Sequence, residues 1–502
     1  MTAAALVVSD SPRARAAAET VLVAVALGVF ADVLFYDAAL GLNAPLWIGA
    51  LVAAVLYISR HREERASTVE VACLALSFAA SAALAWRGSP ALQALLFLAS
   101  GAFLVLGVAV RSGLPWRRAG VAVLLGGLFA AGIAIAAGVY RVQASLELHN
   151  HVLRRSKEGA GTTARIVVIG APLLLIFGLL FASADAVFED HLADLIRIDL
   201  GPVVQHLFWL LAGAWFAGGV TWATFEGRLF EVPEPRLPEA RRLKASEVGV
   251  VLGALAVLFA AFVAVQLRYL FGGHDLVQDT VGLTYAEYAR RGFFELVAAA
   301  VLLLPVLLLA DWARRRGARA NTIYRVLAAL LVSLLFVVML SAVQRMRVYE
   351  EAYGLTEARL YVVAVLLWLA AVFALFFRTL LLGRNDWFVA GSVGAAAGVL
   401  AILVAIAPDA LIASRNIERA SVEHPFDAYH AAGLGADAAP ILARDLDRLS
   451  PSDACIVARS LLDHWGDGSG DDLRSWNWSR AAAARAVDGE RAALEAACDG
   501  QP

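Results

Sequence analysis

Residues 246–267 read SEVGVVLGALAVLFAAFVAVQL, and from Val248 to Val265 this stretch contains no polar side chain. The hydrocarbon core of a bilayer is about 30 Å thick and is crossed by a helix of roughly 20 apolar residues. The stretch therefore predicts a membrane-spanning helix. Runs of the same kind recur throughout residues 19–408, at 20–36, 45–59, 67–86, 91–110, 119–140, 165–184, 203–225, 292–313, 322–344, 358–378 and 387–408.

The composition of the whole chain agrees with these runs. Of the 502 residues, 60% are hydrophobic and only 17% are charged, and the mean hydropathy is +0.70. A soluble domain has roughly a quarter charged residues. Only helices can cross a bilayer as separate segments, because each must satisfy its own backbone hydrogen bonds. We therefore predict an all-α, polytopic transmembrane helix bundle of about 12 spans, with the lipid bilayer as its partner.

The chain divides into three parts by polarity. We predict an N-terminal tail at 1–18, a transmembrane helical domain at 19–408, and a polar helical C-terminal tail at 409–502. Helical patterning in the last part, at 439–449 and 481–497, predicts a small helical unit docked against the membrane part. Three cysteines without CxxC spacing indicate neither a zinc site nor a disulfide framework, although Cys455 and Cys498 of this tail could form a disulfide in an oxidising compartment.

No cofactor, metal or nucleic acid is expected. The formal net charge of -2 gives no electrostatic reason for nucleic-acid binding. His149 and His151 have no third ligand nearby, and Asp467–Asp472 lacks the acid spacing of an EF-hand. His424, Asp427 and His430 could supply two imidazoles and a carboxylate for zinc, but three residues in one short segment are a weak indication of a site. Phosphate-binding, metalloprotease and nucleophile-elbow motifs are likewise missing from the sequence.

The basic residues give conflicting orientations. In the second half, the loops 141–165, 226–246 and 312–325 are rich in arginine and lysine, which places them in the cytoplasm and the C-terminal tail outside. In the first half, arginines before residue 20, at 60–65 and at 111–118 favour a cytoplasmic N-terminus. Twelve crossings cannot satisfy both patterns. Either one run within 112–165 is re-entrant or doubled, or one basic loop is external; the three loops of the second half favour an extracytoplasmic tail.

Charges inside the apolar runs are the best physical indication of a functional site, because they are costly in lipid and face a bundle interior or a water-filled cavity. Asp185 and Glu295 are predicted to pair with Arg268, Arg290 or Arg291 in a polar cluster near the outer face. This cluster is either a structural ion-pair network or a site for a small-molecule or ion ligand. The candidate residues all lie in the apolar runs or in the outer loops beside them. They are Asp32, Asp185, Arg268, Glu287, Arg290, Arg291, Glu295, Glu350, Glu357 and Arg359.

Several phrases in these loops resemble a known family. They are Phe181-Ala-Ser-Ala-Asp-Ala-Val-Phe188, Arg268-Tyr-Leu-Phe-Gly-Gly273, Gly282-Leu-Thr-Tyr-Ala-Glu-Tyr-Ala-Arg-Arg-Gly-Phe-Phe-Glu295 and Tyr353-Gly-Leu-Thr-Glu-Ala-Arg-Leu-Tyr361. With Asp32 and Gly41-Leu-Asn43, they resemble the bacterial membrane proteins grouped as DUF4153/DUF4173-like, over most of 20–420. The resemblance implies an integral membrane protein with many spans, in the bacterial inner membrane, and assigns no catalytic residue.

Three functions fit these observations. The first is a transporter-like or signal-coupled membrane protein with the polar cluster as its ligand site, and the intramembrane acids favour it. The second is a non-catalytic membrane scaffold or assembly partner. The third is a membrane-embedded enzyme that acts on lipid or envelope precursors, with an outer-face carboxylate as general acid or base. Whether the chain is an enzyme stays open at this point.

Overall fold

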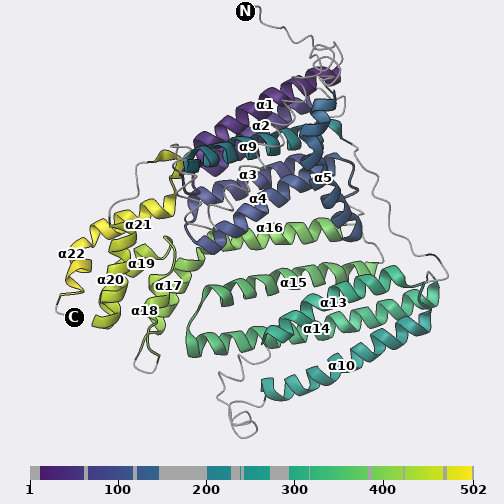
Figure 1. The fold of residues 1–502 in the computed structure, drawn as a ribbon. Helices are drawn as coiled ribbons and strands as arrows, with labels where there is room; N and C mark the ends of the chain where they lie inside the picture. Colours follow the sequence, from purple (N-terminus) through teal and green to yellow (C-terminus); the bar gives the residue numbers. More distant parts are fainter. Residues whose placement is uncertain are drawn as a thin grey trace, which may run out of the picture.

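A computed structural model describes residues 12–60, 66–116, 121–145, 200–227, 238, 242–271, 293–315, 317–382, 387–421, 424–466 and 472–499. Regular structure in these residues is helical, apart from an isolated bridge between Leu243 and Arg314 (Figure 1). The predicted all-α bundle is therefore confirmed, whereas the predicted span 165–184 lies outside the described residues. The long helices are α1 (Pro12–Phe35), α2 (Asn43–Ser59), α3 (Thr68–Trp86), α4 (Pro90–Arg111), α5 (Val121–Ser145), α9 (Leu200–Glu226), α10 (Ala245–Phe271), α13 (Phe293–Ala313), α14 (Ala318–Tyr353), α15 (Glu357–Leu382) and α16 (Phe388–Ile406).

The long helices suit a lipid environment. By length and composition, ten of the described helices could cross a membrane, and α2 is a shorter apolar helix of 17 residues. Large apolar side chains point outward from them, including Leu22, Phe97 and Phe129, which are 60–72% exposed. Surfaces of this kind would aggregate in water but are stable against acyl chains. The chain is a multi-pass membrane protein.

The first helix group consists of α1–α5 and α9, which share one hydrophobic core. Its helices approach closely at small residues. A Cβ atom added to Gly28 of α1 would lie 2.5 Å from the carbonyl oxygen of Leu210 in α9, and one added to Gly138 of α5 would lie 2.6 Å from Cα of Gly219 in α9. Such contacts let backbones pack without intervening side chains, as in many membrane helix pairs.

The second helix group consists of α10 and α13–α16 and packs differently. Its core is built from large side chains, among them Leu331, Leu335 and Phe373, none of which is exposed. α16 also contacts the first group, because Leu403 and Val404 pack in a separate cluster against residues of α2, α3 and α4. In Figure 1, α16 accordingly lies between α4 and α15.

The C-terminal region, residues 408–499, is named the cap. It contains its own hydrophobic core, centred on small residues such as Ala458 and Ala483 with Leu442, Leu461 and Leu494. A disulfide joins Cys455 to Cys498. Its helices are α17 (Pro408–Arg419), α18 (Ala428–Ala432), α19 (Ala439–Arg444), α20 (Pro451–Trp465), α21 (Trp478–Gly489) and α22 (Arg491–Ala496), with short 3₁₀ turns η2 (Leu446–Arg448) and η3 (Leu473–Ser475).

The cap lies at one end of the bundle, named the cap end (Figure 1). It contacts the turns between α1 and α2, between α3 and α4, and between α14 and α15. The opposite end carries arginines near the ends of several helices, and is named the cationic end. There Arg13 and Arg141 both pair with Glu226, and Arg111 pairs with Glu70.

Helix α5 has both of its ends at the cationic end. Before its first turn, Leu114 contacts Gly127, and the ring of Trp116 lies 5.5 Å from that of Trp387. At its last turn, Arg13 of α1 donates to the hydroxyl of Ser145. Figure 1 shows α5 running across the direction of its neighbours. Although α5 is long and apolar enough for a span, it returns the chain to the end from which it came.

This placement removes the conflict between the two halves of the sequence. Ser145 and Leu200, which flank a part of the chain outside the described residues, lie at opposite ends of the bundle. Arg13, Arg111 and Arg141 of the first half therefore lie at the same end as Arg314 of the second half, and the cap lies at the other end. One run within 112–165 that fails to cross was one of the two alternatives from the sequence.

Candidate functional site at the cap end

Asp32 is paired with a histidine from a distant part of the chain. Its Oδ1 lies 2.7 Å from Nδ1 of His206, and the ring of Tyr36 stacks on the imidazole with 3.7 Å between ring centroids. The side chain of Asp32 is 19% exposed and that of His206 is 48% exposed. A carboxylate at Nδ1 fixes the orientation of an imidazole and leaves Nε2 to exchange a proton. The pair is therefore suited to binding or transferring a proton.

The packing of α1 against α9 brings this pair together. Gly28 lies one helical turn before Asp32, on the same face of α1. A Cβ atom added to Gly213 of α9 would lie 2.6 Å from Cβ of Ala31. Larger residues at either glycine would separate the helices, and the short side chain of Asp32 would then lose contact with His206.

A second polar group lies between α10 and α14. The hydroxyl of Ser341 and the guanidinium of Arg345 each donate to the side-chain oxygen of Gln266 at 2.9 Å. Gln266 is only 6% exposed, so these bonds satisfy an amide oxygen in an apolar interior. The arrangement fixes the lateral position of α10 against α14 near the cap end.

Three further predicted residues lie at the turn between α14 and α15. Arg359 donates to the carbonyl oxygens of Tyr353, at 3.2 Å, and of Gly354, and its guanidinium lies 4.1 Å from the ring centroid of Tyr349. Glu350 is half-buried in the last turns of α14, and Glu357 begins α15. These groups stabilise the turn that the cap contacts.

Asp437 of the cap is the centre of the contact with the first helix group. Its Oδ2 accepts from the backbone N–H groups of Gly88 at 2.8 Å and Ser89 at 3.0 Å. Its Oδ1 accepts from the hydroxyl of Ser479 and lies 3.4 Å from a guanidinium nitrogen of Arg87. The carboxylate is 2% exposed, so its charge is balanced by these donors alone.

Asp409 is a second buried carboxylate at the same junction. Its Oδ1 accepts from the hydroxyl of Ser89 at 2.9 Å, and its Oδ2 accepts from the N–H of Gly435 at 2.8 Å. Burial raises the pKa of Asp409 to about 6, against the lowering effect of these two hydrogen bonds, and the charges of Glu357 and Asp437 raise it further. Asp409 can therefore change its charge near neutral pH.

The cap also binds the second helix group. Asn416 of α17 accepts from the N–H of Leu355 at 2.8 Å and donates to the carbonyl oxygen of Leu355 at 2.9 Å. Gly354 has a φ of 77°, which favours glycine, and a Cβ atom there would lie 2.7 Å from Oδ1 of Asn416. The turn between α14 and α15 is thus shaped to receive this asparagine.

The predicted cluster around Asp185 stays a prediction. Asp185, Glu287, Arg290 and Arg291 lie outside the described residues, as does the side chain of Arg268. Glu295 lies in the first turn of α13, at the cap end, with its side chain exposed. Of the predicted residues, the structure brings Asp32 to His206 and gathers Glu350, Glu357 and Arg359 at one turn.

Reasoning from the sequence did not identify Asp409, Asp437 or Asn416 as important residues. Asp409 follows Pro408 directly after an apolar run, and Gly88-Ser89 precedes Pro90, so both could be read as ordinary helix boundaries. The contacts of Asp409 and Asp437 with Ser89 and Gly88 join residues more than 300 positions apart, and those of Asn416 with Leu355 join residues 61 apart. A local sequence pattern cannot predict contacts between residues so far apart in the chain.

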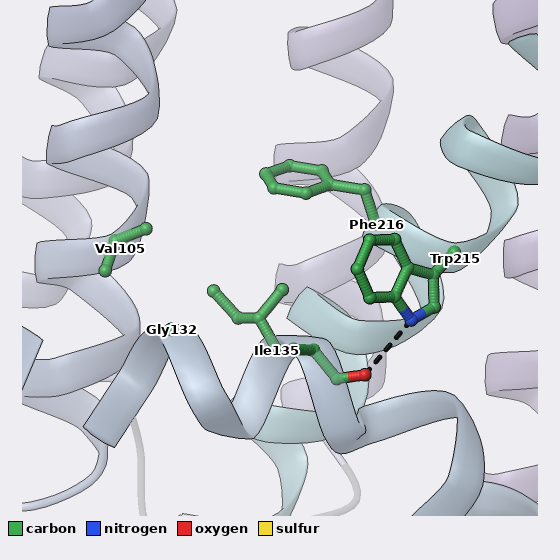
Figure 2. Close-up of a pocket in the computed structure, with 6 residues that line it drawn as sticks. Val105, Gly132, Ile135, Trp215 and Phe216 are labelled. Atoms are coloured by element: carbon green, nitrogen blue, oxygen red, sulfur yellow. Dashed lines mark hydrogen bonds between the residues drawn. The ribbon is translucent and has the colours of Figure 1, made fainter. Parts of the chain in front are cut away.

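The cavity in Figure 2 is unsuited to a polar ligand. It measures about 220 Å³ and lies where α5 crosses α4 and α9, lined by Val105, Gly132, Ile135, Ala136, Trp215 and Phe216. The indole N–H of Trp215 donates to the carbonyl oxygen of Ala136 at 3.0 Å, which satisfies the one polar side chain there. In the described part of the chain, no three His, Cys, Asp or Glu side chains gather as a metal site.

Comparison with known families adds one finding. A family model described as "Domain of unknown function (DUF4153)" matches residues 71–444. The match begins in α3 and extends into α19, so it includes the junction of the cap with the bundle. No curated protein and no solved structure gives a significant match.

Proposed function

Because the chain belongs to the DUF4153 family, whose description names no activity, we propose its function from its own geometry: a transporter-like or signal-coupled membrane protein in which the cap controls how the two helix groups are arranged. The observation that carries the proposal is the position of the cap, which binds the first group through Asp437 and the second through Asn416. A change in the cap would therefore reach both groups together.

The cap is proposed to lie on the extracytoplasmic side. Arg13, Arg111 and Arg141 of the first half and Arg314 of the second half lie at the cationic end, and positively charged loops face the cytoplasm. The disulfide between Cys455 and Cys498 supports the same orientation, because disulfides persist in oxidising compartments. These two arguments are independent of each other.

Asp32 and His206 supply a proton-binding group at the cap end. A pair of this kind, near the turns that the cap holds, suits a ligand or proton site whose occupancy changes the packing of α1 against α9. The ligand class proposed is a proton or a small polar molecule that enters from the extracytoplasmic side.

Distances between the helix groups test the proposal. Spin labels at Thr68→Cys in α3 and Arg319→Cys in α14 report on the two groups at the cationic end, and the distance between them is measured by pulsed electron paramagnetic resonance in nanodiscs. Asp437→Ala and Asn416→Ala are each expected to broaden the distance distribution, whereas Arg444→Ala, an exposed cap residue, is expected to leave it unchanged. Identical distributions in all variants would refute the proposed coupling.

The Asp32–His206 pair also favours a second candidate, a membrane-embedded enzyme with His206 as general base. An enzyme acting on lipid or envelope precursors predicts that cells carrying His206→Gln accumulate a lipid intermediate. An unchanged lipid profile in these cells, together with broadened distance distributions in the cap variants, would favour the transporter-like or signal-coupled protein over the enzyme.

A further inference from the structure

The segment that joins η3 to α21 exposes three large apolar side chains. Leu473 is 77% exposed, Trp476 is 41% exposed and Trp478 is 55% exposed. The two indole rings contact each other edge to face, with 6.3 Å between centroids. This patch, named the interface anchor, is too apolar to be an ordinary water-facing surface of the cap.

Hydrogen bonds fix the interface anchor at the cap end of the bundle. The carbonyl oxygen of Trp476 accepts from the N–H of Leu42, in the turn between α1 and α2, at 2.9 Å. Beside Trp478, Asn477 donates to the carbonyl oxygen of Leu84 at 2.7 Å. The segment is therefore held between the turn of α1 with α2 and the end of α3, and Figure 1 shows α21 leading away from these helices.

The interface anchor continues a lipid-facing surface of α1. Leu22, Val25, Val29 and Val33 lie three or four residues apart, on one face of α1, and are 47–70% exposed. The carbonyl oxygen of Val33, the last of them, accepts from Arg474 at 2.7 Å. The exposed apolar face of α1 thus ends where the cap begins, and Arg474 joins the two.

From these observations we infer that Leu473, Trp476 and Trp478 insert into the head-group region of the leaflet on the cap side. Indole rings prefer this region because they combine a large apolar body with one N–H donor. Trp86, at the end of α3 that Asn477 contacts, is 47% exposed and adds a third indole ring at the cap end. The bilayer would then hold the cap directly, in addition to Asp437 and Asn416.

Accessibility of a spin label at Leu473→Cys tests the inference in the full chain, in nanodiscs and with Cys73→Ala as background. Oxygen dissolves in the bilayer and a charged nickel chelate stays in water. The label at residue 473 is expected to collide more often with oxygen than with the chelate. Glu490→Cys, on an exposed part of the cap at the junction of α21 and α22, serves as the control and is expected to show the opposite ratio.

A second measurement uses the native tryptophans. Lipids brominated near the head group should quench the fluorescence of the wild-type chain more than that of a Trp476→Phe/Trp478→Phe variant. Equal quenching in both, or a label at residue 473 that is as open to the chelate as the control, would overturn the inference. A label shielded from both reagents would mean that a protein covers the patch, and would overturn it as well.

Discussion

The helix bundle and the cap bury leucine side chains equally well, but they fold in different solvents. Leu335 in the second helix group is 0% exposed and Leu461 in the cap is 4% exposed. When the cap unfolds, Leu461 meets water, whereas Leu335 meets acyl chains as apolar as its own surroundings. Hydrophobic burial therefore stabilises the cap but contributes little to association within the bundle.

The bundle relies instead on shape and on polar contacts. Close backbone approaches at glycines hold α1, α5 and α9 together, and hydrogen bonds such as those of Gln266 join the larger helices. The cap, with a small core rich in alanine, adds a disulfide. A leucine that is equally buried in the two regions therefore contributes unequally to their free energies of unfolding.

The largest expected effect comes from one leucine in each region. Leu461→Ala should lower the free energy of opening of the cap by about 3–4 kcal/mol, because the transfer free energy of the removed atoms is lost and a cavity is left behind. Leu335→Ala should lower the free energy of opening of the bundle by only about 1–2 kcal/mol, because only van der Waals contacts are lost. Hydrogen exchange of the full chain in nanodiscs measures both, and equal losses would contradict the comparison.

Reduction of the disulfide should lower the stability of the cap and leave the free energy of unfolding of the bundle helices unchanged. Opening the bond between Cys455 and Cys498 is expected to destabilise the cap by about 2–4 kcal/mol, because the unfolded cap gains conformational freedom. The amides of α13 and α14 provide the internal control in the same exchange experiment. Faster exchange throughout the bundle would mean that the cap does not unfold separately.

Glycine substitutions sharpen the description of the bundle. A Cβ atom on Gly219 would fall on the carbonyl oxygen of Ile135, whereas nothing lies within 4 Å of one on Gly253. We expect Gly219→Ala to cost about 1–3 kcal/mol of stability through overpacking, and Gly253→Ala to cost nothing. The yield of folded protein after detergent extraction measures the difference, and similar yields would argue against close packing of α5 on α9.

The smallest expected effect is a pH dependence at the junction of the two regions. Burial raises the pKa of Asp409 to about 6, so the folded chain favours the protonated form of this side chain more than the unfolded chain does. Protonation of Asp409 therefore stabilises the docked cap. This stabilisation is fully present below about pH 4, the ordinary pKa of aspartate, and is lost as the pH rises through about 6. Asp409→Asn should abolish this dependence.

Protease cleavage between α16 and the cap, followed from pH 5 to 8, measures how tightly the cap is docked. Wild-type protein is expected to become more sensitive as the pH rises, with Glu357 and Asp437 as the nearest charges. The matched control is Asp445→Asn, a carboxylate of the cap that is 19% exposed and paired with Arg444, and it should leave the profile unchanged. A pH profile that persists in Asp409→Asn would exclude this residue as its cause.

Hydropathy was sufficient to predict the helices but not their directions. Each described long helix coincides with a predicted apolar run, because a span must be both helical and apolar. α5 satisfied the same criteria, yet contacts with Leu114 and Arg13 keep both its ends on one side. Length and composition contain no information about such contacts.

The candidate site was predictable only in part. Asp32 could be identified because a short acidic side chain in an apolar run needs a partner, which the structure supplies as His206. Asp409 directly follows an apolar run, where it reads as a helix boundary, and Asp437 lies in the polar tail, where a carboxylate is ordinary. Their importance comes from burial by residues far away in the chain, which the fold alone determines.

The central claim is that the cap and the cationic end face opposite sides of the membrane, with the cap outside. Labelling intact cells with a membrane-impermeant maleimide tests it most directly, using the single-cysteine substitutions Glu490→Cys in the cap and Arg319→Cys at the cationic end, in a Cys73→Ala background. We predict that residue 490 is labelled in intact cells and that residue 319 is labelled only after permeabilisation. Labelling of residue 319 in intact cells, with residue 490 protected, would contradict the account.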